Sequence, residues 1–170
     1  MQHTVIQDVV AGIGQCLKDN SWFLGAAESC TGGLIGSTLT DVPGSSEWFA
    51  GGVEAYANRI KQELLGVAPD ILDTHGAVSR ETVLAMAQGA AKLLEVDVTL
   101  AVSGIAGPSG GTREKPVGTV YMAWYVDGEF SAERFQFTGN RDAIKSQTVT
   151  AAITRLAKLL DWSAREGPSA

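Results

Sequence analysis

Segments with the apolar spacing of helices alternate with short apolar runs along this chain of 170 residues. The helical spacing predicts helices at residues 4–18, 58–65 and 79–95, one that ends at Thr40 and one that begins near Asn140. The apolar runs predict strands at residues 22–27, 48–57, 97–103, 119–126 and 130–137. Loops are predicted at residues 41–46, 67–78 and 104–118. This alternation favours a sheet that is covered by helices on both faces.

The direction of the last two predicted strands is set by the dipeptide Asp127-Gly128, a strong signal for a two-residue β-hairpin loop. The earlier strands are joined through helices, which is typical of parallel neighbours. With 45% hydrophobic residues, the chain can bury one sizeable core. We therefore expect class α/β, a single-domain three-layer α/β/α sandwich with a mixed, mostly parallel sheet, over residues 1–163. Residues 164–170 lose all periodicity and are expected to be a disordered tail.

Charge and composition exclude several classes of protein. Thirteen Lys and Arg against 19 Asp and Glu give a net charge of -6, with no basic stripe, so we expect no nucleic-acid partner. No apolar run could span a bilayer, and Asp8 interrupts the first one, so we expect no membrane contact and a cytoplasmic location. Two cysteines, Cys16 and Cys30, and two histidines, His3 and His75, cannot build a disulfide framework or a zinc site. We expect no metal.

Glycine makes up 20 of the 170 residues, and much of the excess lies in three short segments. In the first segment, Ser29 lies in a turn between a strand and a helix, where backbone N–H groups can meet an anion or an oxyanion. Ser29 is a candidate nucleophile there, and the alternative is that it caps the helix. Cys30 is a rival nucleophile. The sequence lacks a G-x-S-x-G elbow, and His75 has no acidic residue placed to orient it, so a Ser-His-Asp triad is disfavoured.

The second segment ends in a tyrosine and a lysine. Tyr56 is predicted to end a strand, and Lys61 lies in the first turns of the next helix, so both can point to the same strand ends. A lysine that is desolvated, or that lies near Arg59 or Arg113, loses its proton more readily and can act as a general base for a serine. The alternatives are an exposed helix lysine and a tyrosine in the core.

The third segment, residues 103–112, follows an apolar strand and offers many backbone N–H groups to a phosphate. It lacks the G-K-[S/T] ending of a P-loop, and residues 12–14 form only part of a dinucleotide fingerprint. The alternative is that its glycines serve tight backbone paths. Arg141, at the start of the last helix, can pair with a phosphate or form an ordinary surface ion pair.

These segments, in this order, closely resemble the CinA C-terminal domain family, from about Val5 to Leu160. The resemblance is carried by AESCTGG at 27–33, GGV at 51–53 with Tyr56 and Lys61, HGAVS at 75–79, GIAGP at 104–108, GGT at 110–112 and KPVGTVY at 115–121. It implies an activity similar to that of nicotinamide-nucleotide amidohydrolase. Such an enzyme converts nicotinamide mononucleotide and water to nicotinate mononucleotide and ammonia without a cofactor, in pyridine-nucleotide salvage.

The resemblance also implies roles for residues. Ser29 falls on the family's nucleophile, which would be deprotonated by Lys61 with help from Tyr56, and which of these two takes the proton stays open. Oxyanion stabilisation is assigned to backbone N–H groups near residues 31–33, and the substrate phosphate to the loop at 104–112 or to the helix start. The candidate substrate-binding residues are Thr31, Gly32, Gly33, Gly104, Ala106, Gly107, Gly110, Gly111, Thr112 and Arg141.

A second hypothesis is a family member that has kept the fold and the ligand loop but is a catalytically inactive nucleotide-binding or regulatory module. The presence of Ser29, Tyr56 and Lys61 together favours the enzyme. The resemblance further leads us to expect a homo-oligomer, namely a dimer.

Overall fold

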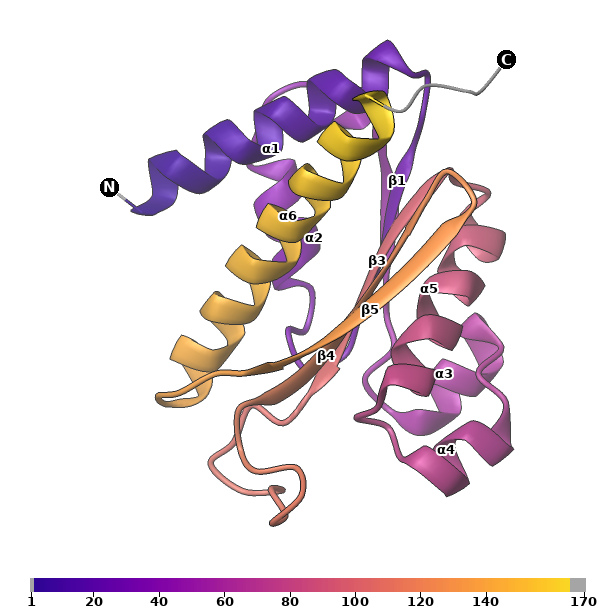
Figure 1. Ribbon diagram of the computed structural model, residues 1–170, viewed down its shortest axis with the longest axis vertical. Helices are drawn as coiled ribbons and strands as arrows, with labels where there is room; N and C mark the ends of the chain where they lie inside the picture. Colours follow the sequence, from indigo (N-terminus) through magenta and orange to yellow (C-terminus); the bar gives the residue numbers. More distant parts are fainter. Residues whose placement is uncertain (1, 166–170) are drawn as a thin grey trace.

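The computed structural model describes the backbone of residues 2–165 and the side chains of residues 5–161. A five-stranded sheet lies between two layers of helices (Figure 1), so the predicted three-layer α/β/α sandwich is confirmed. The elements are α1 (Gln2–Asp19), β1 (Leu24–Glu28), α2 (Leu34–Thr40), the 3-10 turn η1 (Ser45–Glu47), β2 (Phe49–Glu54), α3 (Asn58–Leu65), α4 (Pro69–His75), α5 (Arg80–Leu94), β3 (Val98–Gly104), β4 (Thr119–Val126), β5 (Glu129–Gln136) and α6 (Arg141–Arg165).

The order of strands in the sheet is β2-β1-β3-β4-β5. Strand β1 is parallel to β2 and to β3, while β4 is antiparallel to both of its neighbours. Asp127 and Gly128 join β4 to β5 with positive φ angles of 48° and 90°, as a tight two-residue hairpin requires. The sheet is therefore mixed and mostly parallel, as the sequence predicts.

Alternating side chains along the central strands build two separate cores. On one face, Leu100 and Trp124 belong to the core under α1, α2 and α6, and the Trp124 indole donates a hydrogen bond to the carbonyl of Ala152 at 3.1 Å. On the other face, alanines paired in register across four strands lie in the core under α3, α4 and α5: Ala27, Ala101, Ala123 and Ala132. These small side chains allow α5 to lie close to the sheet.

The carboxyl ends of β1, β2 and β3 meet at one edge of the sheet, because the three strands are parallel. Glu28 at the end of β1 is the register partner of Glu54 at the end of β2 in the parallel strand pair. The first glycine-containing segment follows β1, the second lies in β2 and the connection after it, and the third begins at the end of β3. The fold therefore brings together residues that are far apart in the chain, which is the usual position of a ligand site in an open α/β sheet.

Two local predictions were wrong. Strand β2 ends at Glu54, so Tyr56 lies in the connection before α3 and not in the strand. Residues 67–78, predicted to be a loop, contain helix α4, which begins at Pro69 and is only seven residues long. Pro69 suits the first turn because its φ is fixed and it needs no N–H acceptor there. A helix of this length buries one leucine, Leu72, and leaves too few apolar positions for a periodic pattern.

At the carboxyl end of the chain, α6 continues to Arg165. The remainder of the expected tail, residues 166–170, lies outside the described residues. Within the described part of the chain, no helix combines the length and the apolar character that crossing a membrane would need.

Helix α5 lies close to the end of α3 at Gly89, where an added Cβ would overlap the backbone carbonyl of Leu65. We predict that Gly89→Ala lowers the free energy of unfolding by about 1–3 kcal/mol, because the backbones must separate. The matched control is Gly12→Ala, whose Cβ in helix α1 would meet nothing within 4 Å. That control should raise stability by about 0.5–1 kcal/mol. Urea unfolding of the three proteins measures both effects, and a Gly89→Ala protein as stable as the wild type would contradict the prediction.

Candidate active site

A pocket of about 280 Å³ opens at the carboxyl edge of the sheet. Residues from the turn after β1, the connection after β2, helix α3, the loop before α5, the end of β3, the β3–β4 loop and the start of α6 line it. Eight of the predicted site residues are among them: Ser29, Tyr56, Lys61, Gly104, Ala106, Gly107, Gly110 and Arg141. The predicted residues Thr31, Gly32, Gly33, Gly111 and Thr112 do not line it. The volume is near the lower end of the range for small-molecule sites.

Lys61 is the central polar group of the pocket. Only 1% of its surface is exposed, and its Nζ lies 3.1 Å from Ser29 Oγ. The same nitrogen donates to the carbonyl of Ala55 at 2.7 Å and to that of Tyr56 at 3.0 Å. No carboxylate among the described residues forms an ion pair with it. The hydroxyl and the two carbonyls therefore take up the three N–H directions of the protonated side chain.

Burial lowers the pKa of Lys61 below the ordinary value of 10.5, because the charged form loses its hydration, and the negative charge of a Cys30 thiolate would oppose this shift only in part. The sequence allowed a neighbouring cation as another cause. Arg59 instead pairs with Glu63 at 3.4 Å on the exposed side of α3, and neither Arg59 nor Arg113 lines the pocket. Desolvation is therefore the dominant cause of the shift.

Tyr56 contributes its two polar ends to different neighbours. Its backbone carbonyl accepts from Lys61, while its phenol oxygen accepts from the Arg141 guanidinium at 3.0 Å. The ring is 61% exposed, at the mouth of the pocket. Among the described residues, the phenol makes no hydrogen bond to Ser29 or to the Lys61 amine. The geometry thus places Lys61 nearer to the proton of Ser29 than the Tyr56 phenol.

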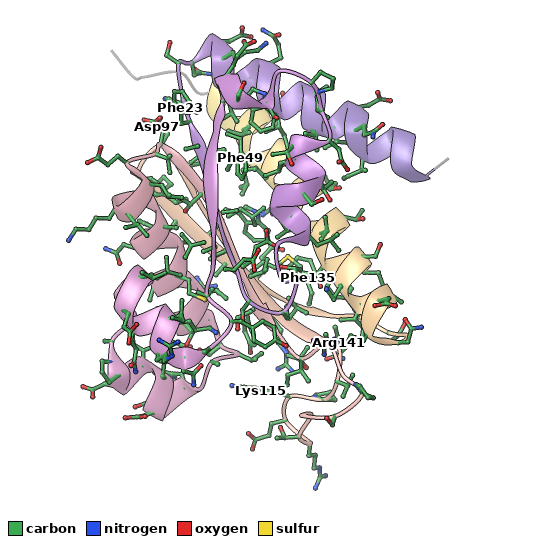
Figure 2. The ribbon with its side chains drawn as sticks, turned by 180° about the vertical axis from the view of Figure 1, so that it is seen from behind. Phe23, Phe49, Asp97, Lys115, Phe135 and Arg141 are labelled. Carbon is green, nitrogen blue, oxygen red and sulfur yellow. The ribbon has the colours of Figure 1, made fainter. Side chains whose placement is uncertain are left out.

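Arg141 lies at the start of α6, beside the long loop between β3 and β4 (Figure 2). Besides the Tyr56 phenol, its guanidinium donates to the carbonyl of Gly107 at 2.8 Å. It therefore links α6, the β2–α3 connection and the loop across the mouth of the pocket.

The loop between β3 and β4 is held at its base and near its tip. At the base, the N–H of Gly118 donates to the carbonyl of Ile105 at 2.7 Å. Near the tip, Lys115 Nζ donates to the carbonyl of His75 at 2.9 Å, which ties the loop to α4 (Figure 2). Gly107 and Gly110 have φ angles of 78° and 92°, which favour glycine. Among the described residues, no acceptor is found for the N–H groups of Gly107, Ser109 and Gly110. These groups are free to bind an anion.

Neither Cys30 as an alternative nucleophile nor His75 as an alternative base is favoured by its surroundings. Cys30 is 6% exposed, and burial raises the pKa of its thiol to about 11, so it carries little thiolate at neutral pH. His75 ends α4, outside the pocket lining, with Nδ1 3.6 Å from a Glu81 carboxylate oxygen. Within the described residues, no three side chains of His, Cys, Asp or Glu are grouped as a metal site would need.

The comparisons with known proteins bear on this arrangement. The model of the CinA C-terminal domain matches residues 6–160. This chain belongs to the CinA C-terminal domain family. A CinA-like protein from Parasynechococcus marenigrum is 54% identical over 148 residues, and one from Thermotoga maritima is 49% identical over 144 residues. Each alignment covers 85% of this chain and 35% of the relative, so the chain spans about a third of the length of these curated relatives.

Solved structures support the same family. A CinA superfamily protein from Klebsiella pneumoniae is 32% identical, with a TM-score of 0.88, over 93% of this chain and 99% of that one. A competence/damage inducible protein from Agrobacterium tumefaciens is 38% identical, with a TM-score of 0.87, over 92% of this chain and 95% of that one. The CinA fold described above is therefore shared over nearly the whole of these chains.

Sequence reasoning assigned no role to Glu28, although it immediately precedes Ser29. Its side chain is 2% exposed, and its carboxylate accepts hydrogen bonds from the start of α2. The available signal was a carboxylate at the end of a strand whose other residues are all apolar or glycine. Such a residue at a buried position must find donors within the fold.

Proposed function

We propose that this protein hydrolyses the carboxamide of nicotinamide mononucleotide to nicotinate mononucleotide and ammonia, with Ser29 as nucleophile and Lys61 as general base. The observation that carries the proposal is the contact of 3.1 Å between Ser29 Oγ and a lysine amine that is buried without a carboxylate partner. A buried lysine of this kind is costly for a fold, and it is useful where a neutral amine is needed.

The two carbonyls that hold Lys61 direct its chemistry. In the neutral amine, two N–H bonds satisfy the carbonyls of Ala55 and Tyr56, and the lone pair faces Ser29 Oγ. The lone pair takes the hydroxyl proton while Oγ bonds to the carboxamide carbon, and the C=O electrons move onto oxygen. The proton then passes to the amide nitrogen, the C–N bond breaks, and ammonia leaves an acyl-enzyme. A water that gives its proton to Lys61 releases the acid and restores Ser29.

We assign the oxyanion to the backbone N–H of Cys30 rather than to residues 31–33. Cys30 follows the nucleophile directly and lines the pocket, whereas Thr31, Gly32 and Gly33 do not. The N–H of Gly32 is also already donated to the carbonyl of Ser29 at 3.2 Å.

We assign the substrate phosphate to Arg141 and the free N–H groups of the β3–β4 loop. Arg141→Gln should then raise KM for nicotinamide mononucleotide by about 10- to 100-fold, because a charge-assisted contact is lost. The same variant should change KM for nicotinamide riboside, which has no phosphate, much less. Tyr56→Phe then shows whether the phenol contributes to this KM, since it removes the hydroxyl that Arg141 contacts and keeps the guanidinium. Equal losses on both substrates would contradict the assignment.

The decisive experiment is ammonia release from nicotinamide mononucleotide by the purified protein without added metal. Turnover that depends on Ser29 supports the proposal. Binding of the mononucleotide without ammonia release would overturn it and favour the second hypothesis, a nucleotide-binding or regulatory module.

A further inference from the structure

We propose that Glu28 is a positioning residue for the reaction, because it fixes both the turn that carries Ser29 and the connection that holds Lys61. This inference rests on the proposed function, and it assigns a role to a residue that does not touch the pocket.

The carboxylate of Glu28 closes the nucleophile turn. Oε1 accepts from the N–H of Gly36 at 2.8 Å, and Oε2 accepts from the N–H of Ile35 at 3.0 Å and from Thr31 Oγ1 at 2.6 Å. The N-cap position of α2 is Gly33, which has no side chain to supply a cap. Glu28 therefore caps α2 from the strand on the other side of the turn.

This arrangement binds both ends of the turn to one side chain. Residues 29–33 connect Glu28, at the end of β1, to the start of α2. The N–H groups of Ile35 and Gly36 in α2 donate to the carboxylate of the same Glu28. Inside the turn, the N–H of Ser29 donates to the carbonyl of Val102 at 3.1 Å. The closed turn and strand β3 thus fix the position of Ser29 Oγ, and both are held by rigid secondary structure.

The backbone of Glu28 reaches the other catalytic group. Its carbonyl accepts from the N–H of Ala55 at 2.8 Å, and the carbonyl of Ala55 accepts from Lys61 Nζ at 2.7 Å. Two consecutive hydrogen bonds therefore connect Glu28 to the amine. A shift of Glu28 would move Ser29 and the Lys61 acceptor together, and small misplacements of reacting groups are costly in rate.

The same contacts decide where a phosphate can bind. The N–H groups of Ile35 and Gly36 at the start of α2 already donate to the buried carboxylate of Glu28, whose negative charge disfavours a second anion at this helix start. Of the two phosphate sites that the sequence offered, this favours the β3–β4 loop.

The test is Glu28→Gln, which keeps the shape of the side chain. It replaces one accepting oxygen with an NH₂ donor, so one backbone N–H of α2 loses its acceptor. We expect kcat for ammonia release to fall by about 10- to 100-fold, with KM within about twofold. The rate at which a fluorophosphonate labels Ser29, followed by mass spectrometry, should fall in parallel. Labelling needs no nicotinamide nucleotide, so it tests the positioning role even if the wild type releases no ammonia.

Two further variants guard against loss of folding. Thr31→Val removes one of the three donors to Glu28 and should slow labelling by a smaller factor, while Glu28→Asp keeps the charge and should recover part of the rate lost in Glu28→Gln. Thermal unfolding is followed for each. Glu28→Gln with a lowered Tm but wild-type kcat and labelling rate would reduce Glu28 to a helix cap and overturn the proposal. A rise in KM at unchanged kcat would overturn it as well.

Discussion

Replacing Ser29 with alanine is expected to lower kcat for ammonia release by at least about 10³-fold, since no covalent intermediate can form. Binding of nicotinamide mononucleotide should persist, because the proposed phosphate contacts come from Arg141 and the β3–β4 loop. Ammonia is measured with an enzyme-coupled assay, and binding by calorimetry. The matched control is Ser103→Ala, which removes a second buried serine of the same pocket.

Ser103 is a suitable control because its hydroxyl donates to the carbonyl of Ala77 at 2.7 Å and not to Lys61. Its loss should leave kcat within about 10-fold of the wild type, as expected for one neutral hydrogen bond. If Ser29→Ala keeps its activity, the serine mechanism fails. The Cys30 thiol, which lines the same pocket, would then be tested by Cys30→Ala in the Ser29→Ala background.

The assembly of the site could be predicted from the sequence in outline. Apolar runs predicted the three strands β1, β2 and β3, and parallel strands place their carboxyl ends on one edge of the sheet. Ser29 and the loop at residues 104–110 meet there for this reason alone. The hairpin at Asp127-Gly128 was equally clear, because few turns suit two positive φ angles.

The burial of Lys61 could not be predicted from spacing. On α3 it occupies a position that an exposed lysine could fill, and the family resemblance was needed to favour the catalytic role over that alternative. It is buried because the β2–α3 connection turns two backbone carbonyls inward, and backbone direction in such a connection has no sequence signature. The hydrogen bond to the Tyr56 phenol could not be predicted either, because its partner Arg141 is 85 residues away in the chain.

Lys61→Met should lower kcat by about 10²- to 10⁴-fold, the contribution typical of a general base. Methionine fills a similar volume but has no lone pair that can take the Ser29 proton. Lys92→Met, at an exposed position in the last turn of α5, is the matched control and should keep wild-type activity. Activity of Lys61→Met near that of the control would transfer the role of base to the Tyr56 phenol, which Tyr56→Phe then tests.

The pH dependence of kcat tests the same assignment. The reaction needs neutral Lys61, so kcat of the wild type should rise with pH as the amine loses its proton. The midpoint of this rise should lie below 10.5, because burial lowers the pKa. The rise should be absent from the residual activity of Lys61→Met. A wild-type profile with its midpoint at or above 10.5 would contradict a desolvated base.

The lowered pKa of Lys61 must also make the free energy of unfolding depend on pH. Between the lowered pKa of folded Lys61 and the unfolded value near 10.5, the unfolded chain binds more protons at this position than the folded one. The free energy of unfolding of the wild type, relative to Lys61→Met, should therefore rise with pH across that window, by at most about 1.4 kcal/mol per pH unit. Paired urea titrations at several pH values measure this difference, whatever methionine costs at the site. A difference that is flat or falls with pH would mean that Lys61 keeps its proton on folding, and it could not then serve as the base.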